Sequence, residues 1–142
     1  MTTYLRLLPL AALLSLPAQA QAAPAEAACT VQISYTVNGT TVESYSNSFT
    51  LTRDAVFVDD LSTPIRAREF RATLTRTADG LVVFVNYFSD VSTFNAIDLD
   101  TSLRLRGAGA LVTDSGSHTF SSSQAVPAGN HTTSHTLVCS RQ

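Results

Sequence analysis

The chain has 142 residues, of which 14% are charged, and its formal net charge is −2 at pH 7. All nine basic residues are arginines. This balance argues against nucleic acid and anionic membranes as partners, because both require a basic footprint.

The first 20 residues have the composition of a cleaved export signal. Arg6 provides positive charge, residues 7–16 form a short apolar segment, and small residues precede a cleavage site after Ala20. Alternative cleavage positions lie at 22–23 and 25–27. The apolar segment is shorter than the about 20 residues of a transmembrane helix, and no second such segment follows. We therefore predict a protein without a transmembrane segment that is exported to the periplasm or the extracellular space.

The remaining length predicts one folded domain. Residues 21–28 are rich in alanine and contain one proline, and we interpret them as a flexible leader. Residues 29–142 are long enough for a domain with its own core and too few for two ordinary domains.

The only two cysteines, Cys29 and Cys139, lie at the two ends of this predicted domain. In an exported protein, an isolated pair of cysteines predicts a disulfide, which would stabilise the fold by about 4–5 kcal/mol through loop closure. The alternative is acylation of Cys29 as a lipoprotein anchor. Residues 26–28 lack the apolar residue expected before such an anchor, and Cys139 would then have no partner.

Residues 29–37 alternate between apolar and polar side chains, which predicts a half-buried β-strand. Asn38-Gly39 follows, and this pair is the strongest short signal for a two-residue hairpin turn. The partner strand runs from Thr40 to Thr52. Its apolar side chains change parity after Val42, so we expect a β-bulge between Ser44 and Asn47. The expected cross-strand pairs are Val37 with Thr40 and Tyr35 with Val42.

Two further strands precede the most apolar part of the chain. Residues 55–58 form a short strand that is closed by a turn at Asp59-Asp60, and residues 65–77 form the next strand. Asp79-Gly80 is a second hairpin signal, and it joins that strand to the apolar run 81–88. The expected cross-strand pairs are Leu74 with Val85 and Ala72 with Tyr87.

The run 81–88 is rich in β-branched and aromatic residues, so it predicts a central strand that is buried on both faces. After a break at Ser89-Asp90, the clearest alternation in the chain follows. One face carries Ile97, Leu99, Thr101, Leu103 and Leu105, and the other carries Asp98, Asp100, Ser102, Arg104 and Arg106. We expect these two strands to form the middle of the domain.

The last third of the chain predicts three more strands. Residues 110–113 form a short strand, residues 114–116 a turn, and residues 117–123 a weak strand around Phe120. The final strand covers residues 132–140. We interpret the weak strand around Phe120 as the candidate edge of a sheet.

Eight or nine short strands with frequent turns and no helical periodicity are typical of an all-β domain. We predict an antiparallel β-sandwich, immunoglobulin-like or jelly-roll-like, with a small closed β-barrel as the alternative. A disulfide between the terminal strands would close an edge of such a sandwich.

Asp98 and Asp100 lie two residues apart on one strand face, which separates them by about 7 Å. They would share a bound Ca²⁺ only if the backbone bent, because calcium needs further oxygen ligands at fixed positions. The strand continues beyond them, so a solvated face is the alternative. We predict no metal site.

Arg66 and Arg68 share one face of the predicted strand 65–77. Two guanidinium groups side by side can hold a carboxylate or a phosphate by fork geometry. The alternative is that they form ion pairs with Asp98, Asp100 or Glu69.

No catalytic motif stands out. The histidines are His118, His131 and His135, and the last two would lie about 13 Å apart on one strand face, too far to share a metal. Ser115-Gly116-Ser117 does not match the nucleophile turn of hydrolases, and no phosphate-binding loop is present. We therefore predict no catalytic residue and no cofactor.

These observations favour a small exported, non-enzymatic β-domain that acts as a binding, surface or structural interaction module. A protein or another component of the cell envelope is the expected partner, and a strand edge is the expected contact. One alternative is a proteinaceous inhibitor of a secreted enzyme such as a lysozyme or protease, because rigid loops bind at a small ordering cost. Another is a hydrolase of unknown substrate that acts through Asp98, Asp100 or a histidine.

Overall fold

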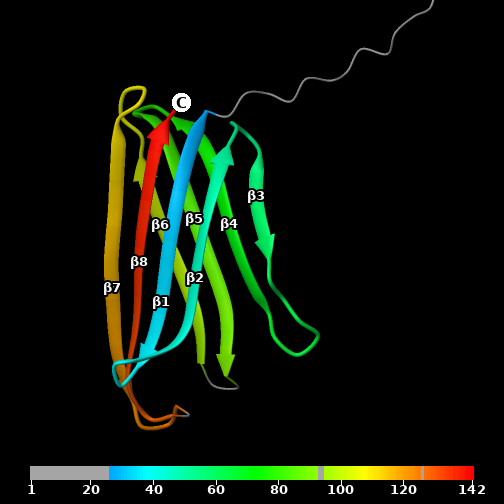
Figure 1. The fold of residues 1–142 in the computed structure, drawn as a ribbon, viewed down its shortest axis with the longest axis vertical. Helices are drawn as coiled ribbons and strands as arrows, with labels where there is room; N and C mark the ends of the chain where they lie inside the picture. Colours follow the sequence, from blue (N-terminus) through cyan, green and yellow to red (C-terminus); the bar gives the residue numbers. More distant parts are fainter. Residues whose placement is uncertain (1–25, 93–94, 126) are drawn as a thin grey trace, which may run out of the picture.

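The computed structural model describes residues 26–92, 95–125 and 127–142, and these residues form two antiparallel β-sheets (Figure 1). The eight strands are β1 (Ala27–Val37), β2 (Thr40–Leu51), β3 (Val56–Asp60), β4 (Arg68–Thr77), β5 (Gly80–Ser92), β6 (Asn95–Arg104), β7 (Leu111–Ser122) and β8 (Gly129–Arg141). The first sheet has the order β2-β1-β8-β7 and the second the order β3-β4-β5-β6. The predicted all-β sandwich is therefore confirmed, and the barrel alternative is wrong because the sheets do not close on each other.

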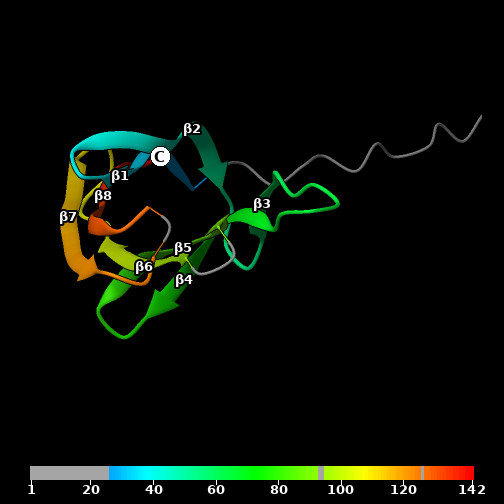
Figure 2. The same ribbon diagram turned by 90° about the horizontal axis from the view of Figure 1, so that it is seen from below.

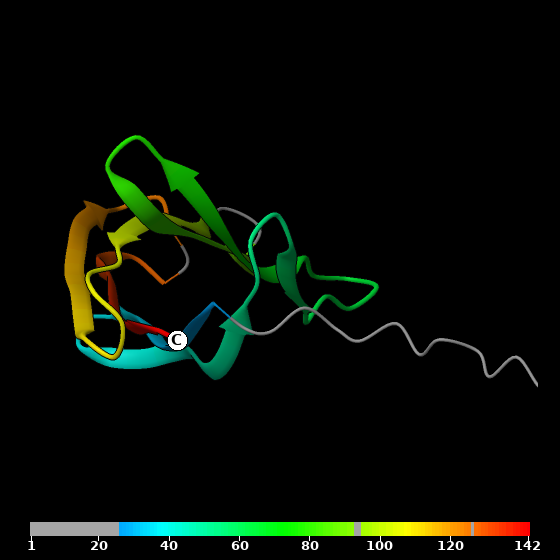
Figure 3. The same cartoon turned by 90° about the horizontal axis from the view of Figure 1, so that it is seen from above.

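The two sheets lie face to face, as the views along the strands show (Figures 2 and 3). The chain forms the β1–β2 hairpin, crosses to the second sheet, runs through β3 to β6 as a meander, and returns with β7 and β8 beside β1. The predicted signal and most of the predicted leader lie outside the described residues, while Ala27 and Ala28 belong to β1. Among the described residues, no helix is long and apolar enough to cross a membrane.

The core lies between the sheets and follows the predicted period of two along each strand. Its centre is an aromatic cluster in which the Tyr45 and Phe70 rings are 5.0 Å apart and the Tyr45 and Tyr87 rings 5.3 Å apart. Phe49 packs against Phe70 at 5.2 Å. Each fully buried side chain of this size contributes about 1.5–3 kcal/mol, so this cluster holds the two sheets together.

The predicted disulfide between Cys29 and Cys139 is present, with Cα atoms 4.1 Å apart. The two residues face each other across β1 and β8, which are the two inner strands of the first sheet. The expectation that the bond closes a sheet edge is therefore wrong. The terminal strands of this chain lie in the middle of their sheet.

The first hairpin turns at Asn38 and Gly39, both of which have positive φ, and Val37 pairs with Thr40 as expected. The predicted bulge exists, but it lies at Val42 rather than between Ser44 and Asn47. Tyr35 therefore pairs with Glu43 and not with Val42. The bulge stands at the residue where the parity changes, and it turns the Glu43 side chain inward.

The second hairpin has a different register from the predicted one. Thr77 pairs with Gly80, so the loop residues are Ala78 and Asp79. Leu74 consequently faces Val83 rather than Val85, and Ala72 faces Val85 rather than Tyr87; the two faces of the strand are unchanged. The Thr77 hydroxyl accepts a hydrogen bond from the Asp79 amide at 3.3 Å and donates to the Gly80 carbonyl at 3.1 Å, which fixes this turn.

Strand β5 was predicted to be buried on both faces and β6 to lie in the middle of the domain, and the structure differs on both points. β5 is an inner strand, but Phe84 is 45% exposed because nothing described covers the outer face of the second sheet. β6 is an edge strand rather than part of the middle. Ile97 and Leu103 are buried on its inner face, as the alternation predicts.

Two predicted turns are parts of strands. Asp59 and Asp60 belong to β3, and residues 114–116 lie inside β7, which runs without a break from Leu111 to Ser122. Adjacent residues of a strand point to opposite faces, so Asp59 points inward and Asp60 outward.

Candidate functional site

The sandwich has two long sides, and the side between β2 and β3 is closed. The Phe49 and Phe57 rings stack there with centroids 5.0 Å apart. The Tyr45 hydroxyl and the Asn47 amide each donate a hydrogen bond to Asp59 at 2.9 Å. Burial raises the pKa of Tyr45, so its hydroxyl remains a donor.

On the opposite side, a side-chain hydrogen bond between described residues links β6 and β7. The Thr101 hydroxyl of β6 donates to Asp114 of β7 at 2.5 Å, and Nε2 of His135 on β8 lies 2.9 Å from the same carboxylate oxygen. The hydrogen bond from Thr101, followed by that from His135, lowers the pKa of Asp114. Asp114 is therefore an anion that joins three strands across the two sheets.

Beyond this link the interior is open. Gly116, His118 and Phe120 share the inward face of β7 with Asp114, yet all three are exposed. A cavity of about 370 Å³ lies between the edge strands. It is lined by Ala96, Ile97, Asp98 and Leu99 of β6, by Gly116, Ser117, His118 and Phe120 of β7, and by Thr133 and His135 of β8. Inward positions of a sandwich normally form its core, so this part of the core is unfilled.

A buried histidine forms the far end of the open region. His131 is fully buried, its Nδ1 lies 2.5 Å from the Tyr35 hydroxyl, and Phe120 stacks on its ring at 4.9 Å. Burial raises the pKa of Tyr35, so its hydroxyl stays protonated beside Nδ1. Nε2 has no partner among the described residues.

The outer edge of β7 is the least protected edge of the described sheets. β7 has 12 residues in unbroken register with β8, and its sequence contains no lysine, arginine or proline. By contrast, β2 has a bulge, β3 has only 5 residues, and β6 carries three charged side chains and a register shift at its start. Proteins usually block long edges with such features. The prediction that the strand around Phe120 is an edge is confirmed.

Arg66 and Arg68, the predicted anion site, meet a carboxylate of the protein itself. Both form ion pairs with Glu43, which is 8% exposed, and the Tyr87 hydroxyl donates to the same group. Arg68 also donates to the Tyr87 hydroxyl at 2.8 Å. The alternative prediction, that these two arginines pair with Asp98, Asp100 or Glu69, is wrong. Glu43 points inward because it follows the bulge at Val42. The bulge was predicted between Ser44 and Asn47, so Glu43 was not identified as a buried partner for the arginines.

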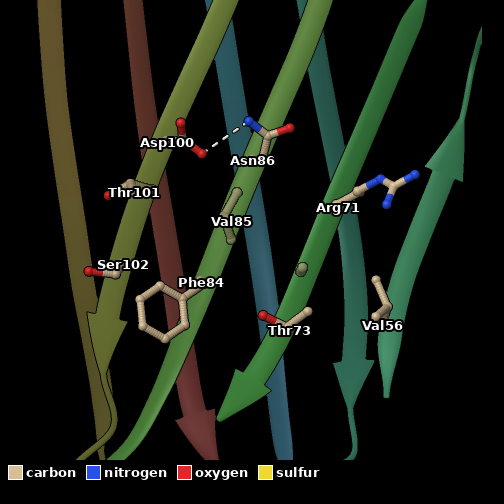
Figure 4. Close-up of a pocket in the computed structure, with 10 residues that line it drawn as sticks. Val56, Arg71, Thr73, Phe84, Val85, Asn86, Asp100, Thr101 and Ser102 are labelled. Carbon is tan, nitrogen blue, oxygen red and sulfur yellow. Dashed lines mark hydrogen bonds between the residues drawn. The ribbon is translucent and has the colours of Figure 1, made fainter. Parts of the chain in front are cut away.

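Asp98 and Asp100 lie exposed on the outer face of β6. The Asn86 amide donates to Asp98 at 3.3 Å. It also donates to Asp100 at 3.0 Å (Figure 4). Across the described ranges, no group of three or more histidine, cysteine, aspartate or glutamate side chains is arranged to hold a metal ion.

The outer face of the second sheet forms a shallow groove of about 480 Å³ beside Asn86 and Asp100 (Figure 4). Val56 and Phe84 supply exposed apolar surface, with Thr73 between them in the cross-strand register. Arg71 lies beside this surface, but it forms an ion pair with Glu69. The groove thus offers mixed polar and apolar contacts, and none of its described lining side chains is a buried charge that would identify a ligand.

Comparison of the chain with protein-family models, curated proteins and solved structures finds no match. The geometry of the open side is therefore the main guide to function.

Proposed function

We propose that the protein is an exported, non-enzymatic binding domain that takes an extended segment of a partner protein as an additional strand beside β7. The observation that carries this proposal is the unprotected edge of β7 next to the unfilled interior between β6 and β7. Either feature alone is common. Together they provide a strand with free backbone groups and a space for the side chains of the added strand.

The added strand would gain affinity from main-chain hydrogen bonds to residues 115–122. Its side chains alternate, so every second one points into the cavity of about 370 Å³. Ile97, Leu99 and Phe120 form an apolar part of the cavity wall, beside the polar side chains of His118 and Thr133. A partner segment with aliphatic side chains at alternate positions complements this wall.

Charge also limits the choice of segment. Residues 115–122 contain no acidic residue, lysine or arginine, and Asp98, which also lines the cavity, accepts a hydrogen bond from Asn86. Asp114 is already bonded to Thr101 and His135. An uncharged segment therefore pairs with this edge at the lowest desolvation cost.

Export is part of the proposal and is supported by the signal-like first 20 residues and by the disulfide. Disulfides persist in oxidising compartments such as the periplasm and the cell surface. A partner in the cell envelope or the surrounding medium fits this setting.

Capture from the envelope fraction, followed by purification of the captured partner, tests the proposal. Ser117→Lys adds a charge to the β7 edge, and Ser46→Lys adds the same charge to an exposed position of β2. We expect Ser117→Lys to weaken binding at least tenfold and Ser46→Lys to leave it unchanged. Hydrogen exchange of residues 115–122 should slow in the complex. Full binding by Ser117→Lys, or protection confined to other strands, would refute strand addition at β7.

A further inference from the structure

The loop between β3 and β4 projects beyond the two sheets on the side away from β7 (Figures 1 and 3). Ile65 lies at its tip and is 96% exposed. A single exposed aliphatic side chain is ordinary on a protein surface. This one differs because the backbone that carries it is held in place by a network of hydrogen bonds.

The tip of the loop is a closed four-residue turn. The Thr63 amide donates to the Arg66 carbonyl at 2.8 Å, and the Arg66 amide donates to the Thr63 carbonyl at 3.2 Å. Pro64 and Ile65 are the two central residues, and proline is favoured at the first of these because its φ is fixed. The Ile65 side chain therefore starts from a defined backbone position.

The stem of the loop is also closed. The Ser62 hydroxyl accepts a hydrogen bond from the Arg68 amide at 3.0 Å and donates to the Arg68 carbonyl at 3.2 Å. The Leu61 amide donates to the same carbonyl at 2.9 Å, and Asp60 accepts from the Ser62 amide at 3.0 Å. These bonds continue the pairing of β3 and β4 up to the turn.

Arg66 fastens the turn to the body of the domain. Its Nε donates to the Asp90 carbonyl at 2.5 Å, and its Nη2 contacts the Ser89 hydroxyl at 2.8 Å and the Glu43 carboxylate. Arg66 follows Ile65 directly, so one residue of the tip is pinned inward while its neighbour points to solvent. The loop pays little further ordering entropy when it binds.

We propose that this Ile65 turn, residues 63–66, is a second docking element that inserts Ile65 into an aliphatic pocket of a folded partner protein. A convex, rigid tip with one projecting side chain requires a concave apolar site on the other molecule. The turn and the β7 edge lie on opposite sides of the sandwich, so each contact forms independently of the other.

A lipid surface is a poorer match for the same tip. Membrane-binding loops combine several apolar side chains with free basic residues. Here Ile65 is the one large apolar side chain exposed at the tip, next to the smaller Pro64, and Arg66 and Arg68 are both bound to Glu43. Asp60 and Asp90 are exposed nearby and would be repelled by an anionic membrane.

Site-specific photo-crosslinking of the full-length exported protein in its producing cells tests this proposal. A photoreactive residue is placed at Ile65 and, as a matched control, at Val42, which is also an exposed aliphatic residue. We expect a defined protein adduct from position 65 that position 42 does not form. The absence of such an adduct, or the same adducts from both positions, would overturn the proposal.

Affinity measurements with the purified crosslinked partner then assign the contact. Ile65→Ser should weaken binding at least tenfold, while Val42→Ser should not change it. Arg66→Gln should weaken binding and speed amide exchange at Thr63 and Arg66 in the free protein. Unchanged affinity for Ile65→Ser, or Ile65-dependent binding to phosphatidylcholine–phosphatidylglycerol vesicles, would contradict a protein pocket. Ser117→Lys should not affect this contact, so failure of the β7 proposal is distinguishable from failure of this one.

Discussion

Gly116 on β7 lies directly opposite His135 on β8, and the His135 ring occupies the space where a side chain at position 116 would begin. A Cβ atom at residue 116 would stand 2.9 Å from Cε1 of that ring. The glycine therefore makes room for a side chain and does not form a turn. It lets the His135 ring lie against β7, where its Nε2 reaches Asp114.

Gly116→Ala should push the His135 ring away from Asp114 and destabilise the fold by about 1 kcal/mol, the low end of the cost of overpacking, because the ring can move toward the cavity. Urea denaturation measures this change. Gly107→Ala is the matched control, because no atom lies within 4 Å of a Cβ at that position, and it should stay within about 0.5 kcal/mol of the parent. Equal unfolding midpoints for the two variants would contradict the packing role of Gly116.

Tyr35→Phe should destabilise the fold by about 1–3 kcal/mol, because it leaves Nδ1 of the buried His131 without a partner. Replacing both groups removes the unpaired atoms, so Tyr35→Phe with His131→Phe should recover part of the loss. Chemical denaturation of the two single variants and the double variant gives the coupling energy. Additive losses would show that the two side chains do not act as a pair.

Glu43→Gln should destabilise the fold by about 2 kcal/mol, because it leaves Arg66 and Arg68 without their shared carboxylate. The estimate lies below the cost for a fully buried pair, since both guanidinium groups are partly exposed and screened by water. Glu69→Gln breaks the exposed pair with Arg71 and should cost less than about 0.5 kcal/mol. Thermal unfolding of both variants at two salt concentrations measures the two losses of stability. A larger loss for Glu69→Gln than for Glu43→Gln would contradict this prediction.

The pKa of Asp114 lies below its ordinary value of 3.8 because Thr101 and then His135 donate hydrogen bonds to it. Ionised Asp114 therefore stabilises the fold above pH 3.8, and this contribution is lost as the pH falls through the lower folded-state pKa. Thr101→Val should raise that pKa and reduce the loss of stability in acid. Carbon-detected titration of the carboxyl group and unfolding between about pH 2 and pH 6 measure both effects.

Ser102→Ala provides the control for this titration, because Ser102 is the neighbouring hydroxyl on the other face of β6. It should leave the titration of Asp114 unchanged. If Thr101→Val and Ser102→Ala titrate alike, the hydrogen bond from Thr101 does not set the pKa.

The features that sequence predicted well depend on local patterns. The alternation through residues 97–105 identified the inner face of β6, and Asn38-Gly39 located the first hairpin. The disulfide could be predicted because the chain has only two cysteines and they lie at the two ends of the domain. Each of these predictions depends on a few neighbouring residues or on the number of cysteines.

The features that were missed depend on contacts between distant residues. Asp114-Ser115-Gly116 has the composition of a turn, yet His135 explains the glycine and Thr101 holds the aspartate. The register of the second hairpin depends on a side-chain hydrogen bond of Thr77. Strand order decides which edges are open, and no local pattern reports strand order. The candidate site was therefore predicted as an edge near Phe120, without its cavity.

The disulfide also determines how the domain carries tension. Glu26 and Gln142 lie at the same end of the first sheet, where the Gln142 amide donates to the Glu26 carbonyl at 3.0 Å. A pull on these two residues would peel β1 from β8 one hydrogen bond at a time, but Cys29–Cys139 stops this peeling at a covalent bond three residues from each. The force then bypasses the chain between the cysteines. A domain tethered at both ends would keep its β7 edge and its Ile65 turn intact under load.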